Sequence, residues 1–155
     1  MNNKQNVFIS YSRADIDSLK RVQVHLKPFE KQGRIDLWDD TKIKAGEHWE
    51  ENIEKALNKA KIAILLISAD FLASDFITDN ELPPLLKAAE EKKTVILIVK
   101  VKPCHITKDS NLTQFQAIHD LKTSVAEQTT ANREVFYSRL CKRVEEILSE
   151  EKIAD

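Results

Sequence analysis

Short apolar runs alternate with segments of helical period along this chain, and this alternation limits the folds open to it more than any other feature. The apolar runs cover residues 6–10, 34–38, 62–68 and 94–101. The last two runs are continuous and rich in β-branched residues, which is typical of strands buried on both faces of a parallel sheet. Between the runs, apolar residues recur every three or four positions, as at Leu19, Val22 and Leu26, and this spacing predicts amphipathic helices. We therefore expect an α/β fold, a flavodoxin-like open parallel sheet of strand order 2-1-3-4-5 with helices on both faces.

A few residues mark the boundaries of these elements. Pro28 should kink or end the first helix, because proline lacks an amide donor and crowds the preceding turn. Gly33 is a suitable helix stop. A short fifth strand is expected near 115–121, before a last amphipathic helix. We assign residues 1–150 to one domain, and the charged tail 151–155 fits the start of a linker to a further domain.

The bulk composition argues against several classes of function. The chain has 155 residues, 42% of them hydrophobic and 32% charged, with a net charge of −1. It therefore lacks the positive field that attracts nucleic acid or anionic lipid. The apolar runs fall far short of the roughly 20 residues that cross a bilayer, and the polar N-terminus shows no signal peptide. We expect a cytoplasmic protein that binds neither nucleic acid nor membrane directly.

The residues of the common cofactor sites are too few or too scattered here. Cys104 and Cys141 are the only cysteines, and the four histidines have no metal-ligand spacing, so we expect no metal and no disulfide framework. The only glycines are Gly33 and Gly46, which cannot form a G-x-G-x-x-G turn or a P-loop. We therefore expect no bound cofactor.

Glu81 is the main candidate for a functional side chain. In the expected sheet, ligands bind where the loops after strands 1 and 3 diverge, and Glu81 ends the segment after strand 3. A helix beginning near Leu82 would carry Pro83 and Pro84 in its first turn, which places Glu81 at or beside the N-cap. There the helix dipole and free amide groups favour an anion. One interpretation is a routine acid at a helix start; the other is a carboxylate that accepts ligand hydroxyls or stabilises positive charge.

Two further segments follow the first two strands and each has two interpretations. Arg13 lies in the loop after strand 1, where it would meet a phosphate, whereas Ser12 or Asp15 in the same loop would simply cap the first helix. Trp38 stands at the end of strand 2, and Asp39 and Asp40 come directly after it. In one interpretation the indole stacks on a base and the carboxylates bind ribose. In the other, the indole belongs to the core and the acids are loop residues.

Four stretches of the chain together resemble the TIR (Toll/interleukin-1 receptor) domain, in a form that looks bacterial. They read "VFISYSRAD", "LWDDTKIKAGEHWEENIEKALNKAKIAILLIS", "SADFLASDFITDNELPPLL" and "VILIVKVKPC". The similarity runs from about Val7 to Leu148. It implies a flavodoxin-like fold, and it implies that the loop 39–48 corresponds to the BB loop, which often forms TIR–TIR contacts.

The resemblance also implies a site. TIR domains include adaptor modules and enzymes that cleave NAD⁺ at the nicotinamide–ribose bond, and Glu81 matches the glutamate of the enzymes. Several of those enzymes have tryptophan four residues before the glutamate, where this chain has Ile77. The remaining residues that we expect to bind the nucleotide or frame its pocket are Ser10, Arg13, Trp38, Asp40, Lys44, Phe71 and Phe76.

These implications lead to two functional hypotheses. The first is an NAD⁺ glycohydrolase that releases nicotinamide and ADP-ribose or a cyclic isomer. It would be the effector module of a larger bacterial immune or cell-suicide protein with a fused sensor domain, activated by homo-oligomerisation through TIR–TIR contacts. The alternative is a non-enzymatic TIR–TIR interaction module, an adaptor or a virulence mimic.

Overall fold

The computed structural model describes residues 4–39, 49–108 and 110–154, without the side chains at 49, 50, 52 and 151–154. The elements follow in the order β1 (Gln5–Ser10), η1 (Arg13–Asp15), α1 (Ile16–Lys31), β2 (Ile35–Trp38), α2 (Trp49–Lys59), β3 (Ala60–Ile67), α3 (Ala69–Ala73), η3 (Ile77–Glu81), α4 (Leu82–Glu90), β4 (Val95–Lys100), η4 (Asn111–Gln114), β5 (Gln116–Ala117), η5 (Val125–Glu127) and α5 (Thr130–Ala154).

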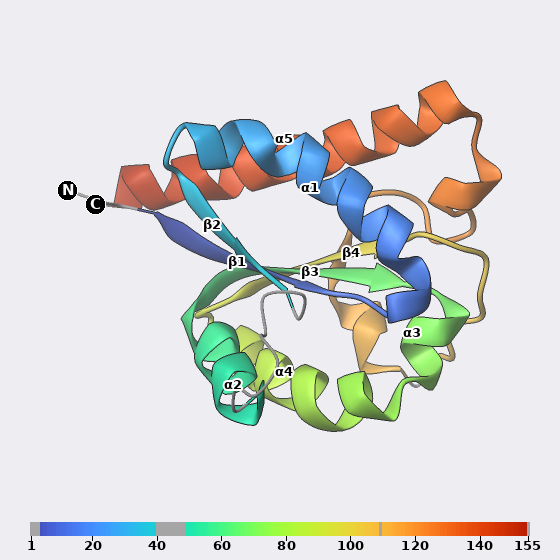
Figure 1. Cartoon of the computed structure of the whole chain (residues 1–155), viewed down its shortest axis with the longest axis horizontal. Coiled ribbons are helices and arrows are strands. Elements are labelled where there is room, and N and C mark those ends of the chain that lie inside the picture. Colours follow the sequence, from blue (N-terminus) through green and yellow to red (C-terminus); the bar gives the residue numbers. More distant parts are fainter. Residues whose placement is uncertain (1–3, 40–48, 109, 155) are drawn as a thin grey trace.

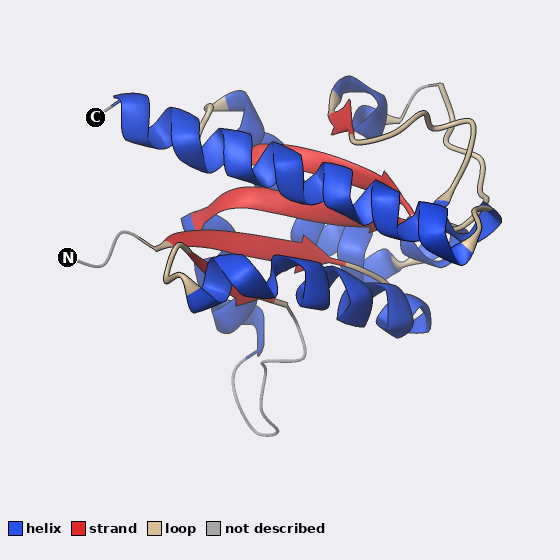
Figure 2. Ribbon diagram, turned by 90° about the horizontal axis from the view of Figure 1, so that it is seen from above, coloured by secondary structure: helices blue, strands red, loops and turns tan. Residues whose placement is uncertain are grey.

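The five strands form one parallel sheet of order β2-β1-β3-β4-β5. Helices α1 and α5 cover one face, and α2, α3 and α4 cover the other (Figure 1). Seen from above, α5 extends along the sheet beside α1 (Figure 2). The predicted flavodoxin-like class and strand order are therefore confirmed.

The side chains of each strand alternate between two cores, one on each face of the sheet. In β1, Val7 and Ile9 pack on the side of α1 and α5, whereas Phe8 packs on the side of α2 and α4. The central strand β3 is apolar at every position from Ile62 to Ile67, and all six residues have no exposed surface. This explains why β3 reads as a continuous apolar run rather than as an alternating one.

Pro28, expected to kink or end the first helix, does not end it. Helix α1 continues to Lys31 with Pro28 inside. The carbonyl that Pro28 leaves without its helical donor belongs to Val24, which is 55% exposed, so solvent can reach it. The predicted stop at Gly33 is confirmed: its φ is 70°, and its amide and that of Arg34 donate back to Glu30 and Phe29. Both bonds belong to a Schellman motif.

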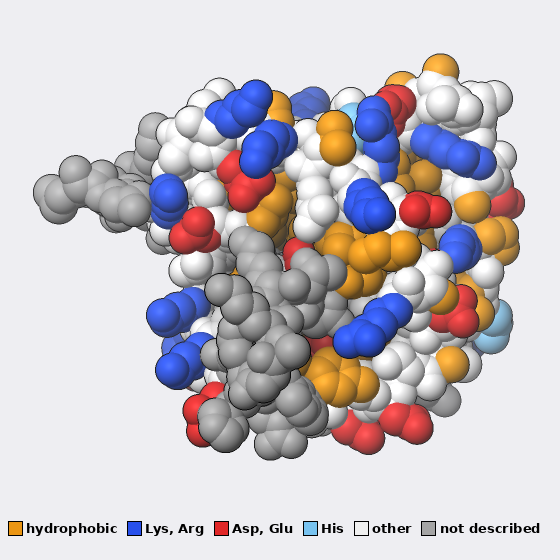
Figure 3. All heavy atoms as spheres, viewed as in Figure 1, with side chains coloured by type: hydrophobic (Ala, Val, Ile, Leu, Met, Phe, Trp, Pro, Cys, Tyr) orange, Lys and Arg blue, Asp and Glu red, His pale blue; other side chains and the backbone are white. Residues whose placement is uncertain are grey.

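The remaining strand lies in the predicted place but is shorter. Residues Gln116–Ala117 pair with β4, within the expected range 115–121. In the described part of the chain, no helix is long and apolar enough to cross a membrane. On the face shown in Figure 3, basic and acidic side chains are interspersed rather than gathered by sign, in keeping with the net charge of −1.

Candidate functional site

Glu81 lies at the junction of two helical segments, where the π-helical turn η3 passes into α4. The amide of Leu82 donates to the carbonyl of Ile77. The predicted position of Glu81 at the N-cap of α4 is confirmed. The Leu82 amide, however, is not free to meet an anion, because the preceding turn is already helical. The Glu81 carboxylate makes no capping bond either, so capping does not explain this residue.

The Glu81 carboxylate instead reaches across to the end of β1. The hydroxyl of Ser10 donates to Glu81 Oε1 over 2.8 Å. Ser10 is 1% exposed and Glu81 4% exposed. Because side chains alternate along a strand, Ser10 points to the same face as Phe8, which is the face that α4 covers. The alternation of β1 therefore aims this hydroxyl at the helix that carries Glu81.

The pair lies where ligands bind in folds of this kind. Strands β1 and β3 are neighbours, yet the chain leaves them in opposite directions across the sheet, to β2 and to β4. The crevice beyond the carboxyl ends of two such strands is the usual ligand site of an open α/β sheet. Ser10 ends β1, and Glu81 closes the segment that follows β3. The structure thus brings these two sequence-predicted site residues together there.

A second polar cluster joins the loops after β1, β3 and β4. Asp15 has a side chain with no exposed surface, and Lys102 Nζ lies 2.6 Å from its Oδ1. The Ser68 hydroxyl donates to the other oxygen, Asp15 Oδ2. The hydrogen bond with Asp15 raises the pKa of the Lys102 ammonium above its usual value. The cluster therefore ties three loops at the carboxyl edge of the sheet.

Of the two residues in the loop after β1 that were expected to cap a helix, only Ser12 makes a capping bond. Ser12 accepts a hydrogen bond from the amide of Ala14 over 3.3 Å, so it caps η1. Asp15 makes no capping bond to α1, because its carboxylate is turned to Ser68 and Lys102. Arg13 is exposed at the start of η1, at the same edge of the sheet.

The end of β2 holds an aromatic stack and a buried acid. Trp38 stacks on Phe8 with ring centroids 5.3 Å apart and planes 16° apart, and it packs against the α2 and α4 core. Asp39 has no exposed surface and accepts a hydrogen bond from Gln23 Nε2 over 3.0 Å. Trp38 therefore packs partly in the core, as one of its two interpretations expects. Asp40 and Lys44 lie outside the described residues.

The aromatic residues after β3 support the segment that leads to Glu81. Phe71 is 1% exposed and belongs to the core, so it offers almost no surface to a ligand. Phe76 is half-buried against the same core. Ile77, at the position of the tryptophan of several related enzymes, is 2% exposed. Of the three, Phe76 has the most surface available.

Sequence reasoning missed Ser68 and Lys102, although a signal for both was present. Each follows the end of a buried strand, and the carboxyl ends of parallel strands share one edge of the sheet. What the sequence does not contain is the partner of each side chain. Asp15 has equally good sequence reasons to cap its own helix, and only the tertiary arrangement decides between the two roles.

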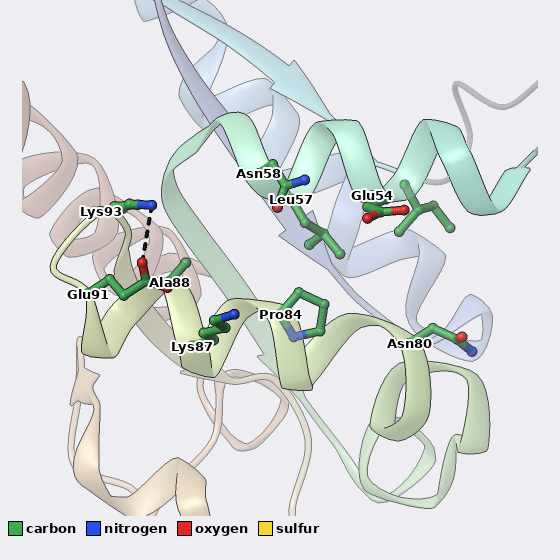
Figure 4. A pocket seen from close by; sticks show the side chains of 10 residues that line it. Glu54, Leu57, Asn58, Asn80, Pro84, Lys87, Ala88, Glu91 and Lys93 are labelled. Carbon is green, nitrogen blue, oxygen red and sulfur yellow. Dashed lines mark ion pairs between the residues drawn. The ribbon is translucent and has the colours of Figure 1, made fainter.

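A separate groove of about 670 Å³ runs between α2 and α4 (Figure 4). Its lining residues are Ile53, Glu54, Leu57, Asn58, Asn80, Pro84, Lys87, Ala88, Glu91 and Lys93. The α4 members recur at helical spacing on the face turned to α2. Glu81 is not among them, since its side chain turns toward β1. The groove and the Ser10–Glu81 pair are therefore distinct features.

Metal-ligand clusters and thiols are two further kinds of group that could form a site among the described residues. Among these residues, no group of three or more His, Cys, Asp or Glu side chains is placed to hold a metal ion. Burial raises the pKa of the Cys141 thiol to about 11 and raises that of Cys104 above its usual value. Both thiols are thus protonated at neutral pH and are poor nucleophiles.

The sequence model described as "TIR domain" matches residues 7–134. The chain therefore belongs to the TIR domain family. Over 99 residues it is 32% identical to protein y4lF of Sinorhizobium fredii, an alignment that covers 64% of this chain and 31% of that protein. The chain thus spans about a third of the length of this curated relative.

Two solved structures are similar to the chain. The TIR domain of the Toll-related receptor TRR-2 from Hydra magnipapillata matches with a TM-score of 0.58 and 18% identity, over 90% of this chain and 97% of that one. This likeness shows the fold. The TIR domains of the activated Roq1 resistosome match with a TM-score of 0.45 and 21% identity, over 64% of this chain and 60% of that one.

Proposed function

We propose that this TIR domain is an NAD⁺ glycohydrolase in which Glu81 is the catalytic residue. The observation that carries the proposal is the pairing of Glu81 with Ser10, 2.8 Å apart at the divergence of β1 and β3. The Glu81 carboxylate makes no capping bond to its helix, and it lies at the edge of the sheet where ligands bind in folds of this kind. Ser10 gives it a fixed orientation.

A single carboxylate is sufficient apparatus for this reaction. The nicotinamide ring of NAD⁺ is a cationic pyridinium, so nicotinamide leaves as a neutral molecule and no general acid is required. The ribose becomes oxocarbenium-like, as in glycoside hydrolysis. Glu81 would hold the ribose hydroxyls and stabilise the developing positive charge. Addition of water then gives ADP-ribose and one proton. Attack by a nucleophile within the nucleotide gives a cyclic isomer instead.

The other predicted site residues take supporting roles in this proposal. Arg13 would meet the diphosphate, and Phe76 would contact the nucleotide beside Glu81. Trp38 would form the wall of the site through the face that it does not stack on Phe8. Asp40 and Lys44 remain predicted nucleotide ligands from the loop 39–48. Ile77 cannot supply the ring stacking that a tryptophan at this position would supply in several related enzymes.

We further propose that the domain acts inside the cytoplasm as the effector module of a larger bacterial immune or cell-suicide protein. A fused sensor domain would bring copies together, and homotypic contacts through the loop 39–48 would activate NAD⁺ cleavage. Sedimentation velocity over a wide concentration range, with NAD⁺ present, tests this step. A sedimentation coefficient that does not change with concentration contradicts it.

Nicotinamide release from NAD⁺ by clustered protein is the direct test of the activity. The domain is tethered at high density on vesicles, because dilute protein would not assemble. We expect release from the wild type and a loss of at least about 100-fold in Glu81→Gln, which removes the charge that stabilises the transition state. Asp79→Asn is the matched control, since Asp79 lies exposed in the same turn. Equal release from a folded Glu81→Gln variant overturns the proposal.

A second candidate function is a non-enzymatic interaction module, and one observation favours it. Glu81 is only 4% exposed and is hydrogen-bonded within the chain, as a purely structural residue would be. In that case Glu81→Gln leaves assembly and partner binding intact, changes in the loop 39–48 abolish them, and clustered wild type releases no nicotinamide.

A further inference from the structure

The Asp15 carboxylate and its two partners form a link of their own between the loops that flank the proposed catalytic centre. Asp15 comes five residues after Ser10, and Ser68 begins the segment that ends in Glu81. The Ser68 hydroxyl accepts a hydrogen bond from the amide of Phe71 over 3.0 Å and donates a hydrogen bond to the Asp15 carboxylate. Both functions of the hydroxyl are thus occupied, and the first turn after β3 is fixed to the first turn after β1.

Lys102 supplies the charge that this link requires. A carboxylate with no exposed surface is costly unless a cation and hydrogen bonds compensate it, and Lys102 Nζ lies 2.6 Å from Asp15 Oδ1. The Lys102 side chain is itself 43% exposed, so its own desolvation is modest. It also donates to the carbonyl of Ala14 over 3.4 Å. Among the described residues, no other cation is paired with Asp15.

The backbone of Val101, directly after β4, is hydrogen-bonded on both sides. The amide of Val101 donates to the carbonyl of Ile67 over 2.9 Å, and the carbonyl of Val101 accepts the amide of Ala126 over 2.9 Å. Val101, the residue before Lys102, is therefore held by Ile67 at the end of β3 and by Ala126 in η5. The Lys102 ammonium reaches Asp15 from the residue after this hydrogen-bonded position.

We propose that Lys102 is a positioning residue for the Ser10–Glu81 site, acting through Asp15 and Ser68. Glu81 is held to β1 directly by Ser10, and the segment 68–81 that carries Glu81 is held to the same loop by this second link. Without Lys102, the buried Asp15 carboxylate turns toward solvent and releases the Ser68 hydroxyl. The segment then gains freedom at its beginning, and Glu81 loses its fixed placement relative to the ribose. This proposal rests on the proposed NAD⁺ cleavage.

The kinetic arm of the test uses clustered protein and nicotinamide release. We expect Lys102→Met to lower kcat about 10-fold with KM changed less than threefold, because misplaced catalytic groups cost turnover more than ground-state binding. Lys102→Arg should restore kcat by returning the cation. Lys122→Met is the matched control, since Lys122 is exposed and its ammonium forms no ion pair with a carboxylate among the described residues; its backbone amide, which donates to Asp120, is unchanged by the substitution. A wild-type kcat in Lys102→Met, or no rescue by arginine, overturns the proposal.

The structural arm needs no substrate, so it separates failure of this proposal from failure of the proposed function. Hydrogen exchange is measured on the same variants. We expect the amides of Phe71 and Leu72, which bond to Ser68, to exchange at least about 10-fold faster in Lys102→Met while those of β4 keep their rates. Unchanged exchange at both amides, or equal acceleration throughout the chain, overturns the link. If the wild type releases no nicotinamide but this exchange pattern is seen, the proposed function fails and the link stands without a catalytic role.

Discussion

At the scale of single residues, the Ser10 hydroxyl is the group whose removal tests the environment of Glu81. In Ser10→Ala the buried carboxylate loses one hydrogen bond, and we expect the free energy of unfolding to fall by about 1.5–3 kcal/mol. In the Glu81→Gln background the same change should cost only about 1 kcal/mol, because a neutral amide oxygen is the weaker acceptor. Urea denaturation of the four proteins measures both values.

The control for this cycle is Ser138→Ala, which removes an exposed hydroxyl from α5. We expect a change within about 0.5 kcal/mol, as for most surface substitutions. Equal losses for Ser10→Ala in the Glu81 and Gln backgrounds would contradict a charge-assisted bond at this site. The pair would then contribute to packing but not to the orientation of a carboxylate.

A second prediction for a single residue concerns His119 and the dependence of stability on pH. Its Nε2 accepts the backbone amide of Lys100 over 3.1 Å, and its ring stacks on Phe136. Burial lowers the pKa of His119 below its usual value. As the pH falls below about 6.5, the unfolded chain therefore takes up a proton at His119 before the folded chain does. The contribution of neutral, buried His119 to the free energy of unfolding is complete above that pH and is lost as the pH falls.

The variant His119→Gln removes the titration while keeping a side-chain acceptor. We expect its free energy of unfolding to fall less steeply than that of the wild type between pH 7.5 and 5, by less than one proton of slope. Urea denaturation at several pH values within this range measures the slopes. Parallel pH profiles for the two proteins would contradict the assignment.

At the scale of the elements, the end of α1 allows backbone strain to be isolated. A Cβ added to Gly33 would meet no heavy atom within 4 Å, so Gly33→Ala is resisted only by the φ of 70°. We expect a loss of about 1–2 kcal/mol, and a smaller one for Gly33→Asn, since asparagine tolerates this conformation better. Thermal unfolding of both variants measures the difference. An alanine variant as stable as the wild type would contradict the Schellman ending.

The elements also show how far sequence alone reaches. The strands were predictable because buried parallel strands are continuous apolar runs, and β3 is the clearest of them. The continuation of α1 past Pro28 was not, because it depends on solvent reaching a single carbonyl. The π-helical turn η3 was not predictable either, since nothing local distinguishes it from an α-helical turn. That turn decides that Glu81 faces Ser10 rather than capping α4.

At the scale of the whole molecule, α5 is attached to the rest of the fold at two separated points. Arg34, just before β2, pairs with Glu145 over 2.6 Å. Nearer the start of α5, Glu134 accepts hydrogen bonds from Arg21 and from His25 Nε2, the latter over 3.0 Å. Both partners belong to α1. The Glu134 hydrogen bonds join the last helix to the first, and the Arg34–Glu145 pair joins the last helix to the turn before β2.

This arrangement predicts how acid weakens the fold. The hydrogen bonds from Arg21, and after them those from His25, lower the pKa of Glu134 to about 2 from its usual 4.5. Its contribution to stability is therefore complete above pH 4.5 and is lost as the pH falls toward 2. We expect Glu134→Gln to have a lower thermal midpoint than the wild type above pH 4.5, with a gap that closes toward pH 2.

The gap should be small and should shrink in 1 M salt, because the carboxylate is exposed and such pairs are screened. Glu146→Gln on the same helix is the control, since its pair with Arg143 lies within α5 and joins no second element. A gap that persists at pH 2, or one of equal size in the control, would contradict the argument. The link between α1 and α5 would then rest on apolar packing, and acid would weaken the layer through other carboxylates.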